Sequence, residues 1–581
     1  MARFNLIKIM NQYSWLFLPI FVYLLVYFLI TQGSQIKFKS IRQIKFLKPL
    51  GFLEVFKRLD FNILIALVLV SYFIFVKYLN HLSFQTAGFD FGIFDQNFFV
   101  QSRFIFPPAN SVRSIENLWI DHQHFTQILL IPLYWFGNGY NGLIMVILSP
   151  VLMILIPTIL IYLSAQNLFK YFKLEYKTRF WLIGLISTLL AIHPYTQASI
   201  EFYYHEQYLF GLFFPLSVYF LTKYLITRLR INLAWLVFSY IAWLGVKEDQ
   251  WLYILTFIIQ SSLWIFILEK LDKTKATEIW NKFKPLWIIN ILSVIGCGVY
   301  WKAIQAWLKV VSPSWGGYIS NYDYFIKINK ELIETQDLSN YWNDLTMVRE
   351  DTATYMYQHF LHFDLLGALW LPVDILVNYS VRLFSSNGFL RHPWFHYGSQ
   401  TPALAISGII FTYIILVKST KFSRYANKYL AFCLGSYILG YMAVIGWSSN
   451  IDINRPNNYS LYSIPRAFIS YKKTANERKS FNQIKNEIKP DFKIRTSSSY
   501  IPQLSARTNI ASLISLDKAT AEENIELINN DKYSYWLIPK KTESTLINKI
   551  NELKNQQINE NKKNNIITIK ETDEQILFKV N

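Results

Sequence analysis

The sequence predicts an α-helical polytopic membrane protein of about ten crossings, followed by a C-terminal soluble α/β domain. Of its 581 residues, 52% are hydrophobic and only 16% are charged, whereas soluble domains carry roughly 25% charged residues. Apolar runs of membrane-spanning length recur between residues 14 and 447, and the chain then becomes polar. We therefore expect three parts: a first span with a basic cytoplasmic loop (1–59), a multi-span core (60–447) and an extracytoplasmic domain (448–581).

The net charge of +19 would suit a protein that binds nucleic acid. The basic residues cluster instead in short loops between apolar runs, as membrane topology requires. We therefore expect membrane lipids as partners and no nucleic acid. The two cysteines, Cys297 and Cys433, lie inside apolar runs and predict no disulfide framework.

The positions of Lys and Arg predict which loops stay in the cytoplasm, because translocating these residues is unfavourable. An apolar run at 15–30 forms the first expected span. The basic loops that we expect inside lie at 37–58, 170–179, 223–230, 270–284 and 418–428. The further spans that connect them with the correct parity are expected at 61–78, 143–163, 179–193, 206–222, 232–246, 251–268, 286–306, 402–418 and 429–447.

Two apolar segments do not fit this series of crossings. Residues 363–384 are apolar enough to cross, but a crossing there would place the loop at 418–428 outside. We expect this segment to be re-entrant or interfacial, broken at Pro372. Residues 127–136 are too short to span a bilayer and are expected at its outer interface.

The chain after Trp447 alternates between helical and strand patterns, which is typical of a small α/β domain. We expect helices at 475–488, 520–530 and 542–557, and strands at 492–497, 533–539, 565–570 and 576–580. The sequence of this part contains no glycine-rich phosphate loop. It therefore predicts a lid, a docking module or an acceptor-binding module rather than a second enzyme.

Six polar segments fall on the outer side in this topology. They are DFGIFDQ (90–96), DHQHF (121–125), HPYTQ (193–197), YYHEQ (203–207), KED (247–249) and RHPWFHYG (391–398). Ionisable groups at the membrane boundary are costly and usually functional. We therefore expect these segments to converge on one site.

The two acids of the first segment, Asp90 and Asp95, are the candidate catalytic residues. Either carboxylate could act as a general base toward a hydroxyl group or bind a divalent cation that neutralises a phosphate. Asp90 could instead only cap a helix that begins at Phe91. The acids are five residues apart, so they share no helix face and would converge only if the backbone bends at Gly92.

The other segments supply candidates for substrate and metal binding. The spacing of His122 and His124 suits metal ligands on a loop, although it is weak on its own. Lys247 could bind a phosphate, or the KED tripeptide could be an ordinary solvated turn. His205 could bind substrate or simply hydrogen-bond to a neighbouring loop. The remaining candidates for contact with a phosphate or with sugar hydroxyls are Glu206, Glu248, Asp249, Arg391, His396 and Tyr397.

Several of these motifs occur in order in a known family. FDFGIFDQNFF, HFTQILLIPLYWF, FYYHEQ, GVKEDQ, HYGSQTPALAISG and SSSYIPQLSARTNI resemble the membrane proteins called domain of unknown function 2079. The resemblance covers roughly residues 60 to 540, and the helix and basic loop before residue 60 depart from the family. That family has no assigned reaction, but its architecture resembles the GT-C class of membrane glycosyltransferases.

The resemblance to the GT-C class implies an acid-bearing first outer loop and a sugar donor carried on a polyprenyl phosphate. By position, Asp90 and Asp95 would be the loop acids. The residues around the cavity would be His124, His205, Lys247, Glu248, Asp249 and His396.

We therefore expect a glycosyltransferase in the plasma (inner) membrane that moves a hexosyl or pentosyl group from a lipid-linked donor to an unidentified acceptor outside. Asp90 is favoured as the base because it lies nearer the span. Lys247 and Arg391 would offset phosphate charge, while His124 and His205 would hold the sugar or a metal. A site for Mn²⁺ or Mg²⁺ would use Asp95, His122 and His124.

Two other function classes remain open from the sequence. A transporter or flippase for a lipid-linked or small polar substrate would use the same charged groups along a path. Many transporters contain internal repeats, and the sequence shows none. A non-catalytic scaffold whose outer domain binds a partner would not need so many His and acidic residues on one side.

Overall fold

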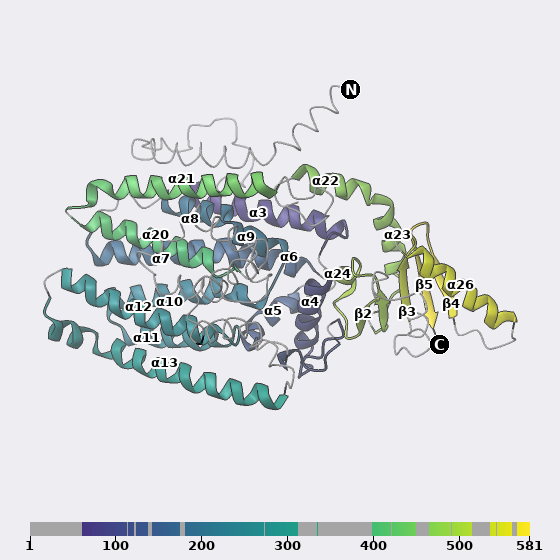
Figure 1. Cartoon of the computed structure of the whole chain (residues 1–581), viewed down its shortest axis with the longest axis horizontal. Helices are drawn as coiled ribbons and strands as arrows, with labels where there is room; N and C mark the ends of the chain where they lie inside the picture. Colours follow the sequence, from purple (N-terminus) through teal and green to yellow (C-terminus); the bar gives the residue numbers. More distant parts are fainter. Residues whose placement is uncertain are drawn as a thin grey trace, which may run out of the picture.

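The computed structural model describes residues 61–311, 334, 398–448, 464–513, 535–559 and 566–580, with short breaks at 87, 113, 121–123, 137–141, 175–180, 272–273, 420, 490 and 542. These residues are mostly helical. Figure 1 shows a long bundle of helices with a small sheet at one end. Two expected segments, the span at 15–30 and the apolar stretch at 363–384, lie outside the described residues.

Within the described part, six helical segments are long and apolar enough to cross a membrane. They are Ile63–Leu82, Leu143–Tyr171, Glu206–Thr227, Gln250–Lys270, Ala276–Ile304 and Thr401–Lys418. Each coincides with a span that the apolar runs predict. The helix α13 (Ala276–Val311) begins ten residues before the predicted span at 286–306, because its first turns are amphipathic and were assigned to the basic loop.

Three other predicted spans form helices that are not among these six candidate membrane spans. The apolar helices α8 (Trp181–Ile192) and α11 (Arg230–Leu244) have only 12 and 15 residues. The helix α21 (Ser423–Ser448) covers the predicted span at 429–447. The segment expected at the outer interface forms η4 (Phe125–Leu130) and α5 (Ile131–Phe136), and it is indeed too short to cross.

The bundle is held together by close pairs of helices. The helical segment that begins at the predicted span at 143–163 consists of α6 (Leu143–Pro150), a π-helical turn η5 (Val151–Leu155) and α7 (Ile156–Tyr171). The helix α10 (Phe210–Thr227) packs along it. Gly211 of α10 lies so close that an added Cβ would come within 2.3 Å of the Leu152 carbonyl oxygen. A glycine there lets the two backbones approach directly.

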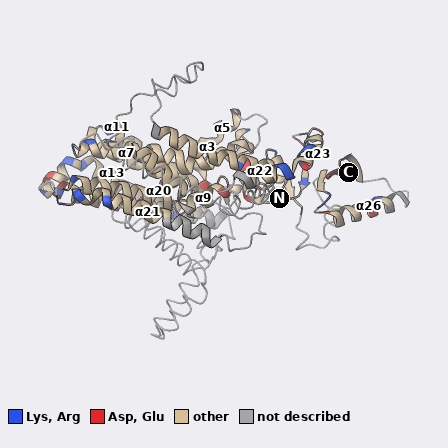
Figure 2. Cartoon of the chain, turned by 90° about the horizontal axis from the view of Figure 1, so that it is seen from above, with Lys and Arg blue, Asp and Glu red and all other residues tan. Residues whose placement is uncertain are grey.

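Charge separates the two ends of the bundle. Figure 2 shows Lys and Arg gathered at the end farthest from the sheet, where α7, α10, α12 (Gln250–Leu271) and α20 (Thr401–Lys418) end. We call this the basic end, and the end that carries the sheet the sheet end. The described parts of four loops predicted to be cytoplasmic, at 170–179, 223–230, 270–284 and 418–428, therefore share one end, as the charge pattern requires. Which end faces the cytoplasm stays a prediction.

The tail forms a five-stranded mixed sheet in the order β2-β1-β3-β5-β4. The strand β1 pairs parallel with β2 and β3, and β5 pairs antiparallel with β3 and β4. The strands are β1 (Ile494–Thr496), β2 (Ile510–Ser512), β3 (Tyr535–Pro539), β4 (Ile566–Glu571) and β5 (Gln575–Val580). Four of them confirm predicted strands. The pattern missed β2, which has only three residues.

The tail helices agree in part with the predictions. The helices α23 (Ala475–Lys485) and α26 (Ser544–Asn559) confirm two predicted helices. The helix α22 (Ile464–Lys473), which packs on α3 (Phe61–Leu82), was not predicted. The helix expected at 520–530 lies outside the described residues.

The two faces of the sheet have different partners. On one face, Trp536 and Phe578 form an apolar cluster with Ile550 of α26. On the other face, Leu537 shares a cluster with Ile93 of α4 (Gly88–Ser102). Neighbouring residues of a strand point to opposite faces, so β3 contributes to both clusters. The sheet therefore has a common apolar core with α4, the helix that carries the two candidate acids.

Candidate functional site

The helix α4 runs unbroken from Gly88 to Ser102. The bend at Gly92 that would bring Asp90 and Asp95 together does not occur, so the two acids lie on different sides of the helix. Gly92 serves close packing instead, because an added Cβ would lie 2.4 Å from a side-chain carbon of Ile501 in the tail. The space around Gly88 is smaller still, since an added Cβ would lie only 1.8 Å from the Ser498 carbonyl oxygen. Both glycines are needed for the tail to dock.

Asp90 belongs to a chain of ionisable groups at the sheet end. Its carboxylate lies 4.0 Å from Nε2 of His205, and the other ring nitrogen lies 3.9 Å from the carboxylate of Glu206. The second oxygen of Glu206 lies 3.1 Å from Nζ of Lys247. The Asp90 side chain is 31% exposed, while those of His205 and Glu206 are almost fully buried. These four residues, which we call the Asp90 cluster, are Asp90, His205, Glu206 and Lys247. They come from three of the predicted polar segments.

The backbone around His205 explains its position. His205 is extended and precedes the short helix η7 (Glu206–Leu209), and Tyr203 two residues earlier has a φ of 60°. A positive φ is uncommon for a bulky residue, so this turn is held by its surroundings. The ring of Phe94 from α4 packs against His205 with centroids 4.9 Å apart. The aromatic residues of the first motif therefore orient the histidine.

Lys247 lies in the turn between α11 and α12. The interfacial segment anchors this turn, because the Thr126 hydroxyl donates to the Ala242 carbonyl at 2.5 Å and the Thr126 N–H donates to the Gly245 carbonyl at 3.0 Å. Gly245 has no room for a side chain, since an added Cβ would lie 2.4 Å from the Thr126 hydroxyl. The position of Lys247 is therefore set by contacts outside its own loop.

Glu248 and Asp249, the other residues of the KED tripeptide, have different surroundings from Lys247. The side chain of Gln250 donates to the carboxylate of Asp249 at 2.7 Å, and the indole of Trp243 donates to Gln250 at 2.8 Å. Burial raises the pKa of Asp249, and the charge of Lys247 acts against this shift. Glu248 is half-buried in the same turn. Gln250 thus ties the start of α12 to the end of α11 and holds the carboxylate of Asp249, so the tripeptide is not a simple solvated turn.

The other predicted residues are distributed around this cluster. His124 is buried, and its ring lies edge-on to the ring of Phe94, with centroids 6.3 Å apart. His193 stacks on Tyr195, and an added Cβ at Gly398 would lie 1.8 Å from the Tyr195 ring. The segments at 193–197 and 398 therefore meet. The predicted residues that lie outside the described part of the chain are His122, Arg391, His396 and Tyr397.

Asp95 is fully buried where α4 meets the tail. The hydroxyl groups of Tyr134 and Ser505 each donate to its carboxylate at 2.6 Å, with a further backbone hydrogen bond from Gly142. Beside it, the Gln96 side chain donates to the carbonyl groups of Arg507 and Thr508, each at 3.1 Å. Asp95 thus joins α4 to the tail through Ser505, and none of its three hydrogen-bond partners belongs to the Asp90 cluster.

The predicted metal site combines Asp95 with His122 and His124. Where residues are described, no three His, Cys, Asp or Glu side chains gather closely enough to bind a metal ion. Asp95 is already surrounded by hydrogen-bond donors, and His122 lies outside those residues. A metal site of Asp95, His122 and His124 stays a prediction.

The buried position of Asp95 predicts a pH-dependent stability. Burial raises its pKa from 3.8 to about 6, and the hydrogen bonds from Ser505 and Tyr134 only partly oppose this. The folded protein therefore holds this proton more tightly than the unfolded chain. The stability from protonated Asp95 is fully present below pH 3.8 and is lost as the pH rises to about 6. We expect a loss of roughly 3 kcal/mol, since a tenfold change in proton affinity is about 1.4 kcal/mol.

The thermal unfolding of the full chain in detergent, followed between pH 4 and 7, measures this effect. In Asp95→Asn, which keeps the shape of the side chain and cannot ionise, Tm should vary much less with pH than in the wild type. Equal pH dependence of Tm in the two proteins would show that Asp95 does not carry this proton.

A second buried pair was missed from the sequence. Lys77 of α3 is 1% exposed, and its Nζ donates to the Glu201 carbonyl at 2.8 Å and lies 3.4 Å from the Glu201 carboxylate. It also lies 3.7 Å from the centre of the Tyr203 ring, which meets Phe91 edge-on. The sequence feature that could have revealed this pair is a lysine inside an otherwise apolar run. This pair holds the turn that precedes His205 against α3 and α4.

Comparisons with known proteins add nothing to this geometry. No family model matches the chain, and no curated protein shows significant similarity to it. The resemblance to the domain of unknown function 2079 family therefore stays a prediction, and function has to be inferred from the site itself.

Proposed function

We propose that the protein is a membrane glycosyltransferase of the GT-C type, which moves a sugar from a polyprenyl-phosphate donor to an acceptor hydroxyl at the sheet end. One observation carries this proposal: the partly exposed carboxylate of Asp90 lies 4.0 Å from His205, within a chain of contacts that ends at the ammonium group of Lys247. A base and a phosphate-binding cation are thus available in one site beside membrane-spanning helices.

The residues of the Asp90 cluster have complementary roles in this reaction. Asp90 removes the proton from the acceptor hydroxyl, whose oxygen forms a bond to the anomeric carbon of the donor. The bond from that carbon to the phosphate oxygen breaks, and polyprenyl phosphate leaves with the electron pair. Lys247 stabilises the charge on this phosphate. Such a direct displacement inverts the anomeric centre.

Glu206 and His205 position these two groups. Glu206 lies 3.1 Å from Nζ of Lys247 and is almost fully buried, so it directs the ammonium group. A lysine ammonium has three donors, which lets Lys247 contact Glu206 and a phosphate together. His205 stands between Asp90 and Glu206 and presents a ring nitrogen to a sugar hydroxyl.

The location and topology form part of the proposal. The chain would lie in the plasma membrane with about ten crossings, its basic end in the cytoplasm and its C-terminal domain outside. This α/β domain, docked on α4 through Ser505 and the carbonyl groups of Arg507 and Thr508, would present the acceptor to the site. The contacts of the domain with the motif helix support this arrangement.

A transfer assay tests the proposal. The protein, purified in detergent with its native lipids, would be mixed with polyprenyl-phosphate sugars, with and without Mn²⁺ or Mg²⁺, and release of polyprenyl phosphate followed. Lys247→Gln should lower kcat/KM by about 10- to 100-fold, as expected for a lost hydrogen bond to a charged group. Lys302→Gln replaces an exposed lysine of α13 and is the matched control.

Two outcomes would contradict this proposal. Equal activity of Lys247→Gln and Lys302→Gln would remove Lys247 from the site. Movement of the intact lipid-linked sugar across vesicles, without release of polyprenyl phosphate, would favour the transporter or flippase instead.

A further inference from the structure

The helix α22 (Ile464–Lys473) lies beside α3 at the sheet end (Figure 1). Its inner face packs into the bundle, because Ala467 is fully buried and Tyr471, one turn later, lies against the same apolar core. The neighbouring face carries Phe468, which is 43% exposed, and Lys472, whose Nζ lies 5.0 Å from the centre of the Phe468 ring. The exposed face of α22 is therefore apolar first and cationic one turn later.

A contact with the chain after α3 fixes the level of α22 relative to the membrane boundary. The candidate span of α3 ends at Leu82, and the side chain of Gln85, three residues later, donates to the Ser470 hydroxyl at 3.0 Å. Ser470 thus lies close to the level where this span ends. Because α22 leads toward α23 and the sheet (Figure 1), Phe468 lies on the bundle side of that level and Lys472 on the sheet side. A membrane that α3 crosses would therefore meet Phe468 with the edge of its hydrocarbon and Lys472 with its headgroups.

The end of α22 and the start of α23 carry a surplus of positive charge. Residues 464–480 contain five Lys or Arg residues and a single acid, Glu477. Glu477 accepts a hydrogen bond from the Tyr500 hydroxyl at 2.7 Å, so its carboxylate is engaged with the tail. Lys472 and Lys473 are exposed, and within the described part of the chain no carboxylate pairs with either of them. Both ammonium groups can therefore contact an anion.

We propose that Lys472 and Lys473 bind the phosphate group of an anionic phospholipid in the leaflet at the sheet end, with Phe468 against its acyl chains. Anionic lipids attract lysines that lie next to a membrane span, and aromatic rings are common at the edge of the hydrocarbon. This contact holds the helix that leads into the sheet at the membrane surface. It involves no residue of the Asp90 cluster, so it does not depend on the proposed function.

A second pair of adjacent lysines in the tail provides a matched control. Nζ of Lys540 lies 2.7 Å from the Glu571 carboxylate, and Nζ of Lys541 lies 3.1 Å from that of Glu574. Changing both lysines of a pair to Gln removes the same charge from the same domain in either case. Surface ion pairs contribute little to stability, so similar Tm values and elution profiles would show that both double variants fold.

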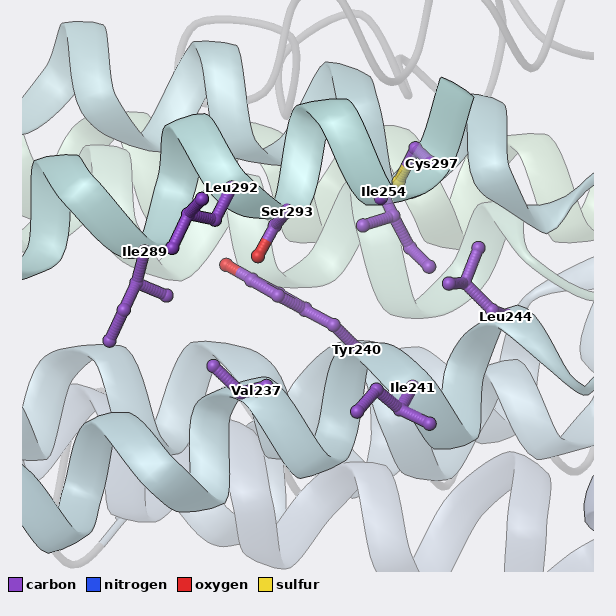
Figure 3. A pocket seen from close by; sticks show the side chains of 10 residues that line it. Val237, Tyr240, Ile241, Leu244, Ile254, Ile289, Leu292, Ser293 and Cys297 are labelled. Carbon is purple, nitrogen blue, oxygen red and sulfur yellow. The ribbon is translucent and has the colours of Figure 1, made fainter. Parts of the chain in front are cut away.

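The helix α13 provides an uncharged reference surface for the measurement. Its residues 286–301 include no charged side chain, and Ile295 and Val299 among them are 57% and 64% exposed. The cavity of about 280 Å³ that α13 forms with α11 and α12 is also lined by uncharged residues, and the hydroxyl groups of Tyr240 and Ser293 point toward each other in it (Figure 3). Lipid on this surface meets no cation that distinguishes one headgroup from another.

Photolabelling of the full-length protein in bilayers of equal parts phosphatidylglycerol and phosphatidylcholine tests the proposal. Each lipid in turn carries a diazirine close to its glycerol group, and labelled peptides are identified by mass spectrometry. The ratio of phosphatidylglycerol label to phosphatidylcholine label on α22 is divided by the same ratio on residues 286–301. We expect about 30 in the wild type, about 5 in Lys472→Gln alone and about 1 with Lys473→Gln added, because each lysine contributes roughly fivefold near an anionic surface.

The control pair, Lys540→Gln with Lys541→Gln, should keep the wild-type ratio. A ratio of 1 in the wild type would overturn the proposal without any variant. An unchanged ratio in Lys472→Gln with Lys473→Gln, or an equal fall in the control pair, would overturn it as well. Displacement of the label by inorganic phosphate at constant ionic strength would show a site for the free anion and exclude the lipid headgroup as its ligand.

Discussion

Replacing Asp90 by Asn is expected to lower kcat/KM for sugar transfer by about 10²- to 10⁴-fold, the usual contribution of a positioned general base. Asn has the same shape as Asp and can still contact His205, which lies 4.0 Å away, but it cannot accept the proton of the acceptor hydroxyl. The measurement is release of polyprenyl phosphate at saturating acceptor, with Tm as the check on folding.

Glu116→Gln is the matched control for this substitution. Glu116 is an exposed acid in the segment that follows α4, so removing its charge changes the same region without touching the Asp90 cluster. We expect it to retain wild-type activity. A similar loss in Glu116→Gln and Asp90→Asn would point to the net charge of this surface rather than to a base.

Lys77→Met is expected to give the largest loss of stability. It leaves the carboxylate of Glu201, 17% exposed, without the ammonium group that lies 3.4 Å away. Removing one partner of a buried ion pair costs about 3–5 kcal/mol, and we expect the lower end of this range because Glu201 keeps some contact with solvent. The measurement is thermal unfolding of the purified protein in detergent.

The double variant Lys77→Met with Glu201→Gln separates the ion pair from packing. Removing both charges should recover much of the lost stability, because no unpaired carboxylate remains. Lys170→Met at the basic end changes an exposed lysine and should leave Tm nearly unchanged. Wild-type stability in Lys77→Met would contradict the role of this pair.

The sequence was sufficient to predict the positions of most helices in the bundle, because long apolar runs and basic loops can be recognised from neighbouring residues alone. The helix α20 coincides with the predicted span at 402–418 to within one residue. The helix α8 ends at Ile192, one residue before the predicted end of its span, where His193 and Pro194 interrupt the apolar run. Among the strands, β2 escaped prediction because its sequence, Ile510, Ala511 and Ser512, contains a single β-branched residue.

The candidate site was harder to predict because its contacts join distant parts of the chain. Asp90, His205 and Lys247 were each singled out by charge at a membrane boundary, and the structure brings them together. The role of Asp95 was not predictable, since its partner Ser505 lies 410 positions away. Periodicity shows which face of a helix is polar, but not which distant segment covers that face.

Gly92 shows how a correct local observation led to a wrong expectation. A glycine between two acids permits a bend, and a bend would have united the carboxylates. The same lack of a side chain also permits close packing, and α4 uses it for contact with Ile501. The choice between these uses depends on the tail, which the local sequence does not specify.

We propose that the two acids of α4 have different roles: Asp90 acts on the substrate, and Asp95 fastens the tail to α4. The most direct test compares Asp90→Asn and Asp95→Asn in parallel, measuring both polyprenyl phosphate release and the pH dependence of Tm. We predict that Asp90→Asn loses turnover and keeps the wild-type pH dependence, whereas Asp95→Asn keeps turnover within about tenfold and loses much of that dependence. Full turnover in Asp90→Asn, or loss of turnover confined to Asp95→Asn, would contradict this account.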